Sequence, residues 1–319
     1  MRWLLVLLAA CSSDPQTPSD ATIGAHDATL VDATPPVAAG CITDVSAGDH
    51  TFTCGGLQTD VRIPAACEAP GCGLILELHG DTGTGLLMDG HTNLRALGEQ
   101  HGYIVVAPSG PPWQGGGPGS TWHASNDATL IDITTQFRDV FRVDPDKIHV
   151  TGFSRGSFVT WRLLCDHADL FASAAPGGGG DGTDFGEVTC FSNNRTPSRH
   201  LPIIFLMGQL DQSVGYPSLV QIRDAAIASY GLATSSTISS DTTYHHDRWS
   251  GTASTTVIET FDHGYATVPD GPFASAQGHC IAGSTSNPYA PQYAIPCKLP
   301  NSFVWGEEVM TFFLAHPMS

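Results

Sequence analysis

Short apolar runs alternate with segments of helical periodicity along most of this chain, and this order limits the fold more than any other feature. Residues 74–78 (LILEL) predict a buried strand, residues 93–101 a helix, and residues 103–107 (YIVVA) a strand that stops at Pro108. The alternation continues with a helix at 127–143, a strand at 147–150, a helix at 158–164, a strand at 201–207, a helix at 218–230, a strand at 256–261 and a helix at 303–315. Strands that alternate with helices form a mainly parallel sheet with helices on both faces. The sequence therefore predicts an α/β fold.

A serine lies between two glycines at the junction of the strand at 147–150 and the helix that follows. The segment GFSRG at 152–156 has the Gly-x-Ser-x-Gly pattern of a nucleophile elbow, in which a strand turns sharply into a helix. Glycines on both sides remove Cβ atoms that would collide in such a turn. The turn raises the serine hydroxyl above the carboxyl edge of the sheet, beside the amino end of the helix. The pattern predicts Ser154 as a nucleophile.

A serine nucleophile needs an imidazole to take its proton and a carboxylate to orient that imidazole. In chains with this elbow the three residues follow in the order Ser, Asp or Glu, His. Asp211 comes shortly after the apolar strand at 201–207 and is the predicted acid. Asp184 and Asp241 lack so clear a strand before them, so both are weaker candidates.

His279 is the predicted base, because it lies in a glycine-flanked loop between the last strand and the last helix. A side chain in that loop can reach over the edge of the sheet. His263 follows the strand at 256–261 and is a rival candidate. His245 and His246 lie in a polar stretch that predicts a solvated loop, and His316 is close to the end of the chain.

An oxyanion hole needs two backbone N–H donors in fixed positions. The residue after the nucleophile, Arg155, supplies one, and the loop at 79–83 (HGDTG) after the strand at 74–78 supplies the other. In this loop the N–H of Asp81 is the expected donor and that of Thr82 the reserve. For the Arg155 side chain we expect a solvated position on the acidic surface, so only its backbone is assigned a role.

The first residues, MRWLLVLLAAC, predict a lipoprotein-type signal segment at 1–11. The apolar run at 3–10 is too short to span a bilayer, and it ends in LAAC, where Cys11 is the expected site of lipid modification. The alternative is an ordinary secretory signal near a cysteine. Either predicts export, to the cell envelope as a lipoprotein or to the medium. Residues 12–40 are rich in Ser, Asp, Thr, Pro and Ala and predict a disordered tether, which leaves 41–319 as the catalytic domain.

The charge balance limits the possible partners. The formal net charge is −18, with only 13 Lys and Arg residues, and this field opposes binding to nucleic acid. Membrane contact is expected only through the lipid anchor at Cys11. No cofactor is expected, and the oligomeric state is left open.

Export also determines how the cysteines are interpreted. Without Cys11 eight cysteines remain, an even number in an oxidising compartment where disulfides persist. A metal site is disfavoured, because no two of them have C-x-x-C spacing and no histidine lies at ligand spacing from two of these thiols. Their loop-rich settings predict pairing between sequential neighbours: Cys41 with Cys54, Cys67 with Cys72, Cys165 with Cys190 and Cys280 with Cys297.

Five segments carry a further pattern: LHG at 78–80, ALGEQHGYIVVAP at 96–108, FRVDPDKIHVTGFSRGS at 141–157, FASAAPG at 171–177 and GHCIAG at 278–283. In this order they resemble the polyhydroxybutyrate depolymerase and feruloyl esterase group of α/β-hydrolases, over nearly the whole folded part. The resemblance implies the α/β-hydrolase fold. It also implies Ser154, Asp211 and His279 as nucleophile, acid and base, with oxyanion donors on Arg155 and Asp81.

The chain departs from the pattern of that group at three places. Arg155 stands where a small residue or Asn is usual, Ser157 stands in place of a second glycine, and residues 281–282 replace the Trp-Pro of the histidine loop. The first departure narrows or charges the pocket mouth, and the last removes an aromatic wall. The substrate class therefore follows less directly than the triad.

These features predict a carboxylic ester hydrolase that works through an acyl-enzyme. The expected substrates are short hydroxyalkanoate oligomers, or feruloyl or acetyl esters on plant polysaccharide. A serine peptidase is one alternative, but such enzymes usually carry an extra propeller or cap domain, for which this chain has no room. A non-catalytic surface binding protein is another, although loss of a triad member would be its signature. The Ser- and Thr-rich segment at 232–254 has no predicted role.

Overall fold

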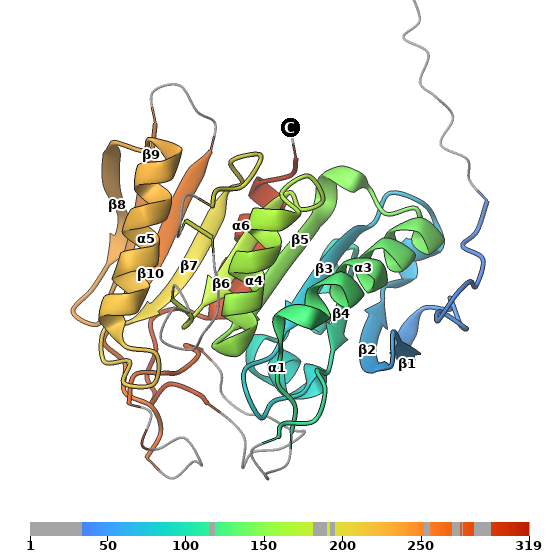
Figure 1. The fold of residues 1–319 in the computed structure, drawn as a ribbon, viewed down its shortest axis with the longest axis horizontal. Coiled ribbons are helices and arrows are strands. Elements are labelled where there is room, and N and C mark those ends of the chain that lie inside the picture. Colours follow the sequence, from blue (N-terminus) through green and yellow to red (C-terminus); the bar gives the residue numbers. More distant parts are fainter. Residues whose placement is uncertain are drawn as a thin grey trace, which may run out of the picture. The chain divides into compact units, whose positions relative to one another are not determined.

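The computed structural model describes residues 34–114, 119–180, 190–191, 195–251, 256–269, 275, 277–283 and 295–318 (Figure 1). The chain divides into two compact units, Met1–Asp32 and Ala33–Ser319, and all described residues belong to the second. The predicted signal segment, with Cys11, and most of the predicted tether lie outside the described residues. The division at residues 11 and 40 stays a prediction.

The described residues form one ten-stranded sheet in the order β1-β2-β4-β3-β5-β6-β7-β10-β9-β8. The six strands from β4 to β10 are parallel, and an antiparallel pair of strands lies at each edge. The strands are β1 (Gly48–Cys54), β2 (Leu57–Ile63), β3 (Gly73–Leu78), β4 (Tyr103–Pro108), β5 (Ile148–Phe153), β6 (Ser173–Gly177), β7 (Ile203–Gly208), β8 (Thr234–Ser240), β9 (Tyr244–Ser250) and β10 (Val257–His263).

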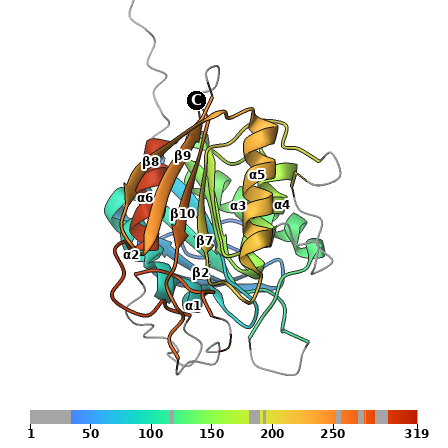
Figure 2. The ribbon, with the colours of Figure 1, turned by 90° about the vertical axis from the view of Figure 1, so that its left-hand side faces the viewer.

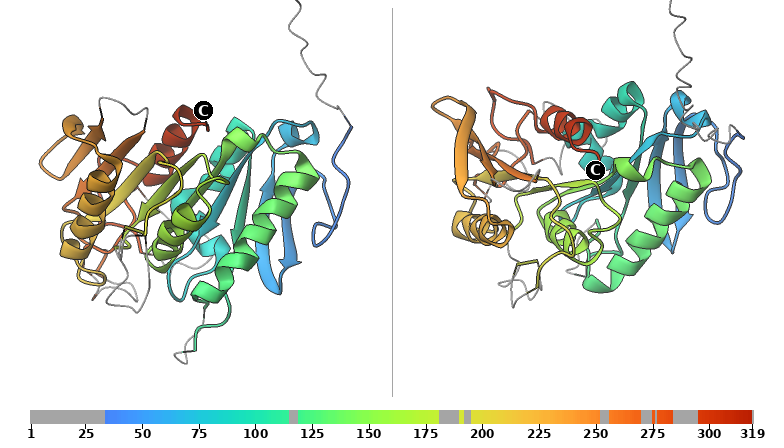
Figure 3. Two further views of the ribbon diagram at one scale, coloured as in Figure 1. Left: turned by 45° about the horizontal axis from the view of Figure 1, so that its top comes forward. Right: turned by 90° about the horizontal axis from the view of Figure 1, so that it is seen from above.

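Helices cover both faces of this sheet, which confirms the predicted α/β architecture. Figure 2 views the sheet along its edge, with helices on either side, and Figure 3 shows the same layers from above. One face carries α3 (Asp127–Phe141), α4 (Arg155–Asp166) and α5 (Tyr216–Tyr230), and the other carries α1 (Gly85–Thr92), α2 (Leu94–His101) and α6 (Trp305–Ala315). Among the described residues, no helix is both long and apolar enough to cross a membrane.

The central strands are buried on both sides, which explains their mainly apolar sequences. Successive side chains of a strand point to opposite faces. In β3, Leu74 and Leu76 therefore belong to the apolar cluster that includes Phe137 of α3. Ile75 belongs to the cluster on the other face, with Trp305 of α6. These two cores hold the sheet between its helical layers.

The edge hairpin of β1 and β2 is absent from the sequence-based expectation, although a local signal for it exists. The strands are joined by Gly55 and Gly56, which have φ of 57° and 82°. Two successive residues with positive φ are typical of the tight hairpin turn that matches the twist of paired strands, and Gly-Gly is a favourable sequence for it.

The hairpin of β8 and β9 corrects a second expectation. His245 and His246 were expected in a solvated loop, but both lie in β9. His246 is buried, and its Nε2 lies 2.7 Å from a carboxylate oxygen of Glu259 in β10. The segment lacks an apolar pattern because β8, at the edge of the sheet, is almost entirely exposed.

Four disulfides join the described cysteines. The pairs are Cys41–Cys54, Cys67–Cys72, Cys165–Cys190 and Cys280–Cys297, the same pairs that the sequence predicts. The last of these bonds begins at the residue after His279 and therefore fixes the predicted histidine loop.

The disulfide between Cys41 and Cys54 attaches the end of β1 to the segment before the edge hairpin, and its contribution to stability can be measured. Replacing both residues with serine is expected to lower the free energy of unfolding by about 3 kcal/mol, because the bond spans 13 residues and restricts the unfolded chain. Urea unfolding of the variant beside the wild type, both oxidised, measures the loss. The matched control removes the Cys67–Cys72 bond, which spans 5 residues and should matter less. A larger loss in the control would contradict this account.

His149 of β5 gives the fold a pH dependence. Its ring is fully buried and stacks on Phe313, with the two ring centres 4.4 Å apart. Burial, aided by the nearby His316, lowers the pKa of His149 from 6.5 to about 3. Between these pH values the unfolded chain binds a proton here that the folded chain does not, so stability falls as the pH falls. This residue alone should cost roughly 2 kcal/mol between pH 7 and pH 5.

The His149→Gln variant separates this contribution from that of the other titrating groups. Urea unfolding at pH 7 and pH 5 should show a decrease in the variant that is smaller by about that amount. Equal decreases in the two proteins would show that His149 is not the source.

Candidate active site

Ser154 lies at the sharp turn between β5 and α4. Its backbone has φ 55° and ψ −118°, a conformation that residues with side chains rarely adopt. Its N–H donates to the carbonyl oxygen of Gly177 in β6 at 2.8 Å. A Cβ on Gly156 would lie 2.2 Å from the carbonyl oxygen of Leu78, so only glycine lets α4 begin against the end of β3. The structure thus gives the GFSRG segment the strand, turn and helix of a nucleophile elbow.

Asp211 and His279 form a buried hydrogen-bonded pair. His279 Nδ1 lies 2.7 Å from Asp211 Oδ2, and Asp211 Oδ1 accepts from the N–H groups of Ser213 and Val214, both at 2.9 Å. Burial alone would raise the pKa of Asp211, but the hydrogen bond and charge of His279 and the two backbone donors together lower it below its ordinary value. A carboxylate only accepts hydrogen bonds, so Nδ1 carries a proton and the lone pair of a neutral ring is on Nε2.

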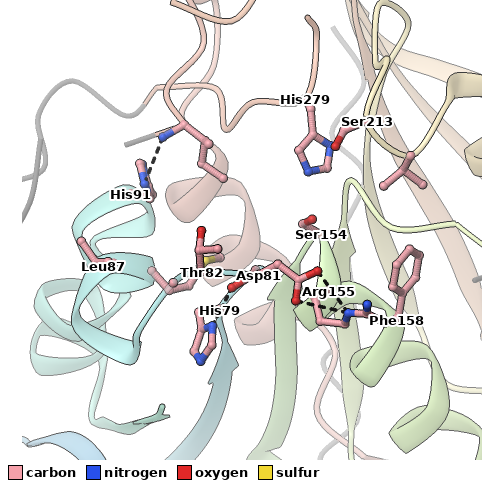
Figure 4. Close-up of a pocket in the computed structure, with 15 residues that line it drawn as sticks. His79, Asp81, Thr82, Leu87, His91, Ser154, Arg155, Phe158, Ser213 and His279 are labelled. Carbon is pink, nitrogen blue, oxygen red and sulfur yellow. Dashed lines mark hydrogen bonds and ion pairs between the residues drawn. The ribbon is translucent and has the colours of Figure 1, made fainter. Parts of the chain in front are cut away.

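The loop around His279 is held on several sides. Gly278 has φ 73°, and a Cβ on it would lie 2.5 Å from the backbone nitrogen of Asp211. The imidazole packs on Phe153, with the two ring centres 4.8 Å apart, and the next residue, Cys280, forms a disulfide with Cys297. In Figure 4 the ring lies over the Ser154 side chain, and both residues line one pocket. The structure therefore brings together Ser154, Asp211 and His279, as the chain order predicts.

The rival residues lie elsewhere. His263 is buried in β10, where its Nδ1 accepts from the N–H of Tyr265 at 3.3 Å and burial lowers its pKa to about 4. His316 follows α6, with its Nδ1 2.8 Å from the Phe312 carbonyl oxygen. Asp241 is exposed and accepts from the hydroxyl of Ser302. None of these three rivals lines the pocket of Ser154. Asp184 lies outside the described residues.

Hydrogen bonds hold the loop at 79–83 in place. His79 is fully buried, and burial lowers its pKa to about 4, so its ring is neutral near pH 7. Its Nδ1 donates to the Gly80 carbonyl oxygen at 2.7 Å, while its Nε2 accepts from the N–H of Gly110 at 2.9 Å. The Thr82 N–H donates to the Ser120 carbonyl oxygen at 2.8 Å. Because this bond already uses the Thr82 N–H, the Asp81 N–H is the better candidate for the second oxyanion donor.

The Arg155 side chain is not the solvated surface group that the sequence suggested. It is 17% exposed and lines the pocket, with its Nε 3.3 Å from each carboxylate oxygen of Asp81. Its guanidinium carbon also lies 5.8 Å from the centre of the Phe158 ring. The expectation fails because a residue in the first turn of α4 faces the loop after β3, where Asp81 supplies a carboxylate.

Several pocket residues have no signal in the sequence analysed alone. The pocket, of about 770 Å³ with its open mouth, lies at the carboxyl edge of the sheet. Its walls are largely apolar and come from α1, α4, the loop after β7 and the segment before Cys297. The apolar lining residues are Leu87, Met88, Phe158, Val214 and Ile295, and the further polar ones are Thr82, His91 and Ser213. Helix α1 is short and was not predicted, which is why its side chains were missed.

One group of described side chains has the spacing of a metal site, but its chemistry does not fit. His263, Cys280 and Cys297 place one potential ligand atom each within 4.8 Å of the others. The two sulfurs are bonded to each other, so neither is a thiolate. The group therefore provides a single conventional ligand atom.

No protein-family model matches the chain. Among curated proteins it is 27% identical to a protein named as an esterase, NocK, from Nocardia uniformis subsp. tsuyamanensis, over 65% of this chain and 62% of the relative. It is 28% identical to poly(3-hydroxyalkanoate) depolymerase C of Paucimonas lemoignei, over 40% of this chain and 32% of that protein. It is 32% identical to acetylxylan esterase A of Aspergillus awamori, over 32% of this chain and 36% of the relative. The chain spans less than two thirds of the length of each.

A solved structure supports the same fold. The acetyl xylan esterase from Aspergillus awamori superposes with a TM-score of 0.55 and 18% identity, covering 68% of this chain and 94% of that one. The parallel sheet, its two helical layers and the elbow after β5 agree with this likeness. The chain therefore has the α/β-hydrolase fold, and its sequence is similar to those of the poly(3-hydroxyalkanoate) depolymerase and the acetylxylan esterases.

Proposed function

We propose that this protein is a serine-dependent carboxylic ester hydrolase that acts through an acyl-enzyme. The observation that carries the proposal is the buried hydrogen bond between His279 Nδ1 and Asp211 Oδ2 beside a pocket that Ser154 lines. A lone serine on a strained turn is a weak nucleophile, whereas a serine beside an oriented imidazole can transfer its proton as it attacks.

In the first half of the proposed reaction, Ser154 Oγ attacks the ester carbonyl carbon while His279 Nε2 takes the hydroxyl proton. Collapse of the tetrahedral intermediate breaks the bond to the alcohol oxygen, and His279 returns the proton to the leaving alcohol. In the second half, water loses a proton to His279 and attacks the acyl carbon. The bond from that carbon to Ser154 Oγ then breaks, and His279 returns the proton to Oγ as the acid leaves. Asp211 holds the ring and stabilises the imidazolium that forms in each half.

Two backbone donors, the N–H groups of Arg155 and Asp81, stabilise the negative charge that develops on the carbonyl oxygen in this proposal. Arg155 is the first residue of α4, at the end of the helix where the helix dipole favours negative charge. Asp81 follows β3 at the same edge of the sheet. Both residues line the pocket together with Ser154.

The pocket walls and the relatives favour small esters with an apolar acyl or aromatic part. Leu87, Met88, Phe158, Val214 and Ile295 can exclude water around such a group. Relatives named as a poly(3-hydroxyalkanoate) depolymerase and as acetylxylan esterases support short hydroxyalkanoate oligomers and acetyl esters. Feruloyl esters stay a prediction from the sequence.

Export is part of the proposal, because four disulfides suit an oxidising compartment. Lipid anchoring at Cys11 stays a prediction.

The Ser154→Ala variant tests the nucleophile. Initial rates on p-nitrophenyl acetate, a 3-hydroxybutyrate trimer and methyl ferulate should fall at least about a thousandfold on whichever substrates the wild type cleaves. Ser157→Ala is the matched control, because Ser157 lies in the first turn of α4, just after Ser154. Its hydroxyl donates to the Gly179 carbonyl oxygen, and the residue does not line the pocket. The control should keep its activity within a few-fold. A wild type as inert as Ser154→Ala on all three esters would sink the esterase proposal.

The Asp211→Asn variant tests the orienting acid. An amide in place of the carboxylate can favour the wrong ring tautomer, so kcat should fall by roughly three to four orders of magnitude. Asp241→Asn changes an exposed rival aspartate and should leave kcat unchanged. Similar kcat values for Asp211→Asn and the wild type would remove Asp211 from the mechanism.

A further inference from the structure

An ion pair between Arg155 and Asp81 lines the pocket. Arg155 Nε contacts Asp81 Oδ1 and Oδ2, at 3.3 Å each, and the hydroxyl of Thr121 donates to Asp81 Oδ1. Figure 4 shows the two charged side chains facing each other beside Ser154. This pair is part of neither the hydrogen-bonded acid and base nor the nucleophile, so its role is not explained by the proton transfers.

The two residues of this pair carry the two backbone donors proposed for the oxyanion hole. These donors lie on different elements, 74 positions apart in the sequence: one at the first residue of α4, the other in the loop after β3. An oxyanion hole requires both N–H groups within hydrogen-bond distance of one oxygen atom, and a displacement of 1 Å can cost about a hundredfold in rate. Their relative position must therefore be set by contacts between the two elements.

The backbone around Asp81 is fixed on the side away from α4. Thr82 N–H donates to the Ser120 carbonyl oxygen, and Trp122 Nε1 donates to the His79 carbonyl oxygen at 2.9 Å. These bonds attach the loop to the segment at 120–122. From α4, the side chain of Arg155 contacts the Asp81 carboxylate, so it reaches from one proposed donor residue to the other.

We propose that the side chains of Arg155 and Asp81 position the oxyanion hole by linking the two residues whose N–H groups form it. This inference rests on the proposed function and goes beyond it by giving the side chains a positioning role. The hydroxyl of Thr121 donates to the same Asp81 carboxylate and helps to hold it in place.

Both side chains of the pair are partly exposed, so we expect the pair to contribute little to the stability of the fold. The two side chains are 17% and 40% exposed, and ion pairs at such positions contribute little to stability. The pairing also argues against Arg155 as a receptor for an acidic substrate, because Asp81 already neutralises its charge. Loss of the pair is therefore expected to change the rate of the chemical step, with little effect on unfolding or on substrate binding.

The test uses Arg155→Met and Asp81→Asn, which remove one charge each and keep both backbone N–H groups. On p-nitrophenyl acetate, a neutral ester, each variant should lose about tenfold to a hundredfold in kcat, with KM within about twofold of the wild type. A neutral trifluoromethyl ketone, whose adduct with Ser154 places an oxyanion in the hole, should bind more weakly by a similar factor. The double variant should lose no more than the worse single variant, because both changes break one link.

Two further variants keep the result interpretable. Arg155→Lys retains a charge beside Asp81 and should lose less kcat than Arg155→Met, and it replaces that variant if the methionine protein fails to fold. Arg138→Met breaks an exposed pair with Asp139 on α3 and should leave kcat and the ketone affinity unchanged.

The outcomes separate this inference from the esterase proposal. If the wild type is as inert as Ser154→Ala, the esterase proposal fails and the positioning role fails with it. If the wild type is active but both single variants keep wild-type kcat and ketone affinity, the positioning role alone is wrong. A loss confined to an anionic ester, such as the p-nitrophenyl monoester of succinic acid, would instead make Arg155 an anion receptor and overturn the proposal.

Discussion

The close approach of α4 to the end of β3 is the contact on which the pocket depends. A Cβ on Gly156 would lie 2.2 Å from the Leu78 carbonyl oxygen, and one on Gly152 would lie 2.5 Å from the Gly156 carbonyl oxygen. Without these two glycines the chain could not turn at Ser154 and still pack its helix against the neighbouring strand. The same contact brings the amino end of α4 beside the loop that begins at His79. One steric requirement therefore places the serine beside the two residues whose N–H groups are proposed as oxyanion donors.

The parallel strands and the chain order of Ser154, Asp211 and His279 could be predicted because their signals are local. Strands such as β3 are buried on both faces, so their sequences are mainly apolar and stand out from their surroundings. The elbow is marked by its own glycines, and Asp211 closely follows a strand. The disulfide pairs agree with the prediction because each joins sequential neighbours across a short separation.

Features that depend on contacts between distant segments could not be predicted in the same way. The pairing of Arg155 with Asp81 joins the first turn of a helix to a loop 74 positions earlier, and the local sequence around Arg155 suggests only an exposed cation. Helix α1 contributes pocket walls but has too short a pattern to recognise. The strand β8 (TSSTISS) has no alternation of apolar and polar residues, because it has no buried face that would require one.

That exposed strand has a consequence for how folded copies of the protein meet one another. A strand at the edge of a sheet presents unpaired N–H and C=O groups to other chains, and long apolar edges promote aggregation. Here the strands of the parallel core lie inside the sheet. Strand β8 forms one edge, and its side chains are Ser and Thr except for Ile238, with an irregularity between Thr237 and Ser239. A polar, irregular edge pairs poorly with a further strand. The arrangement therefore opposes edge-to-edge aggregation while the apolar strands stay covered.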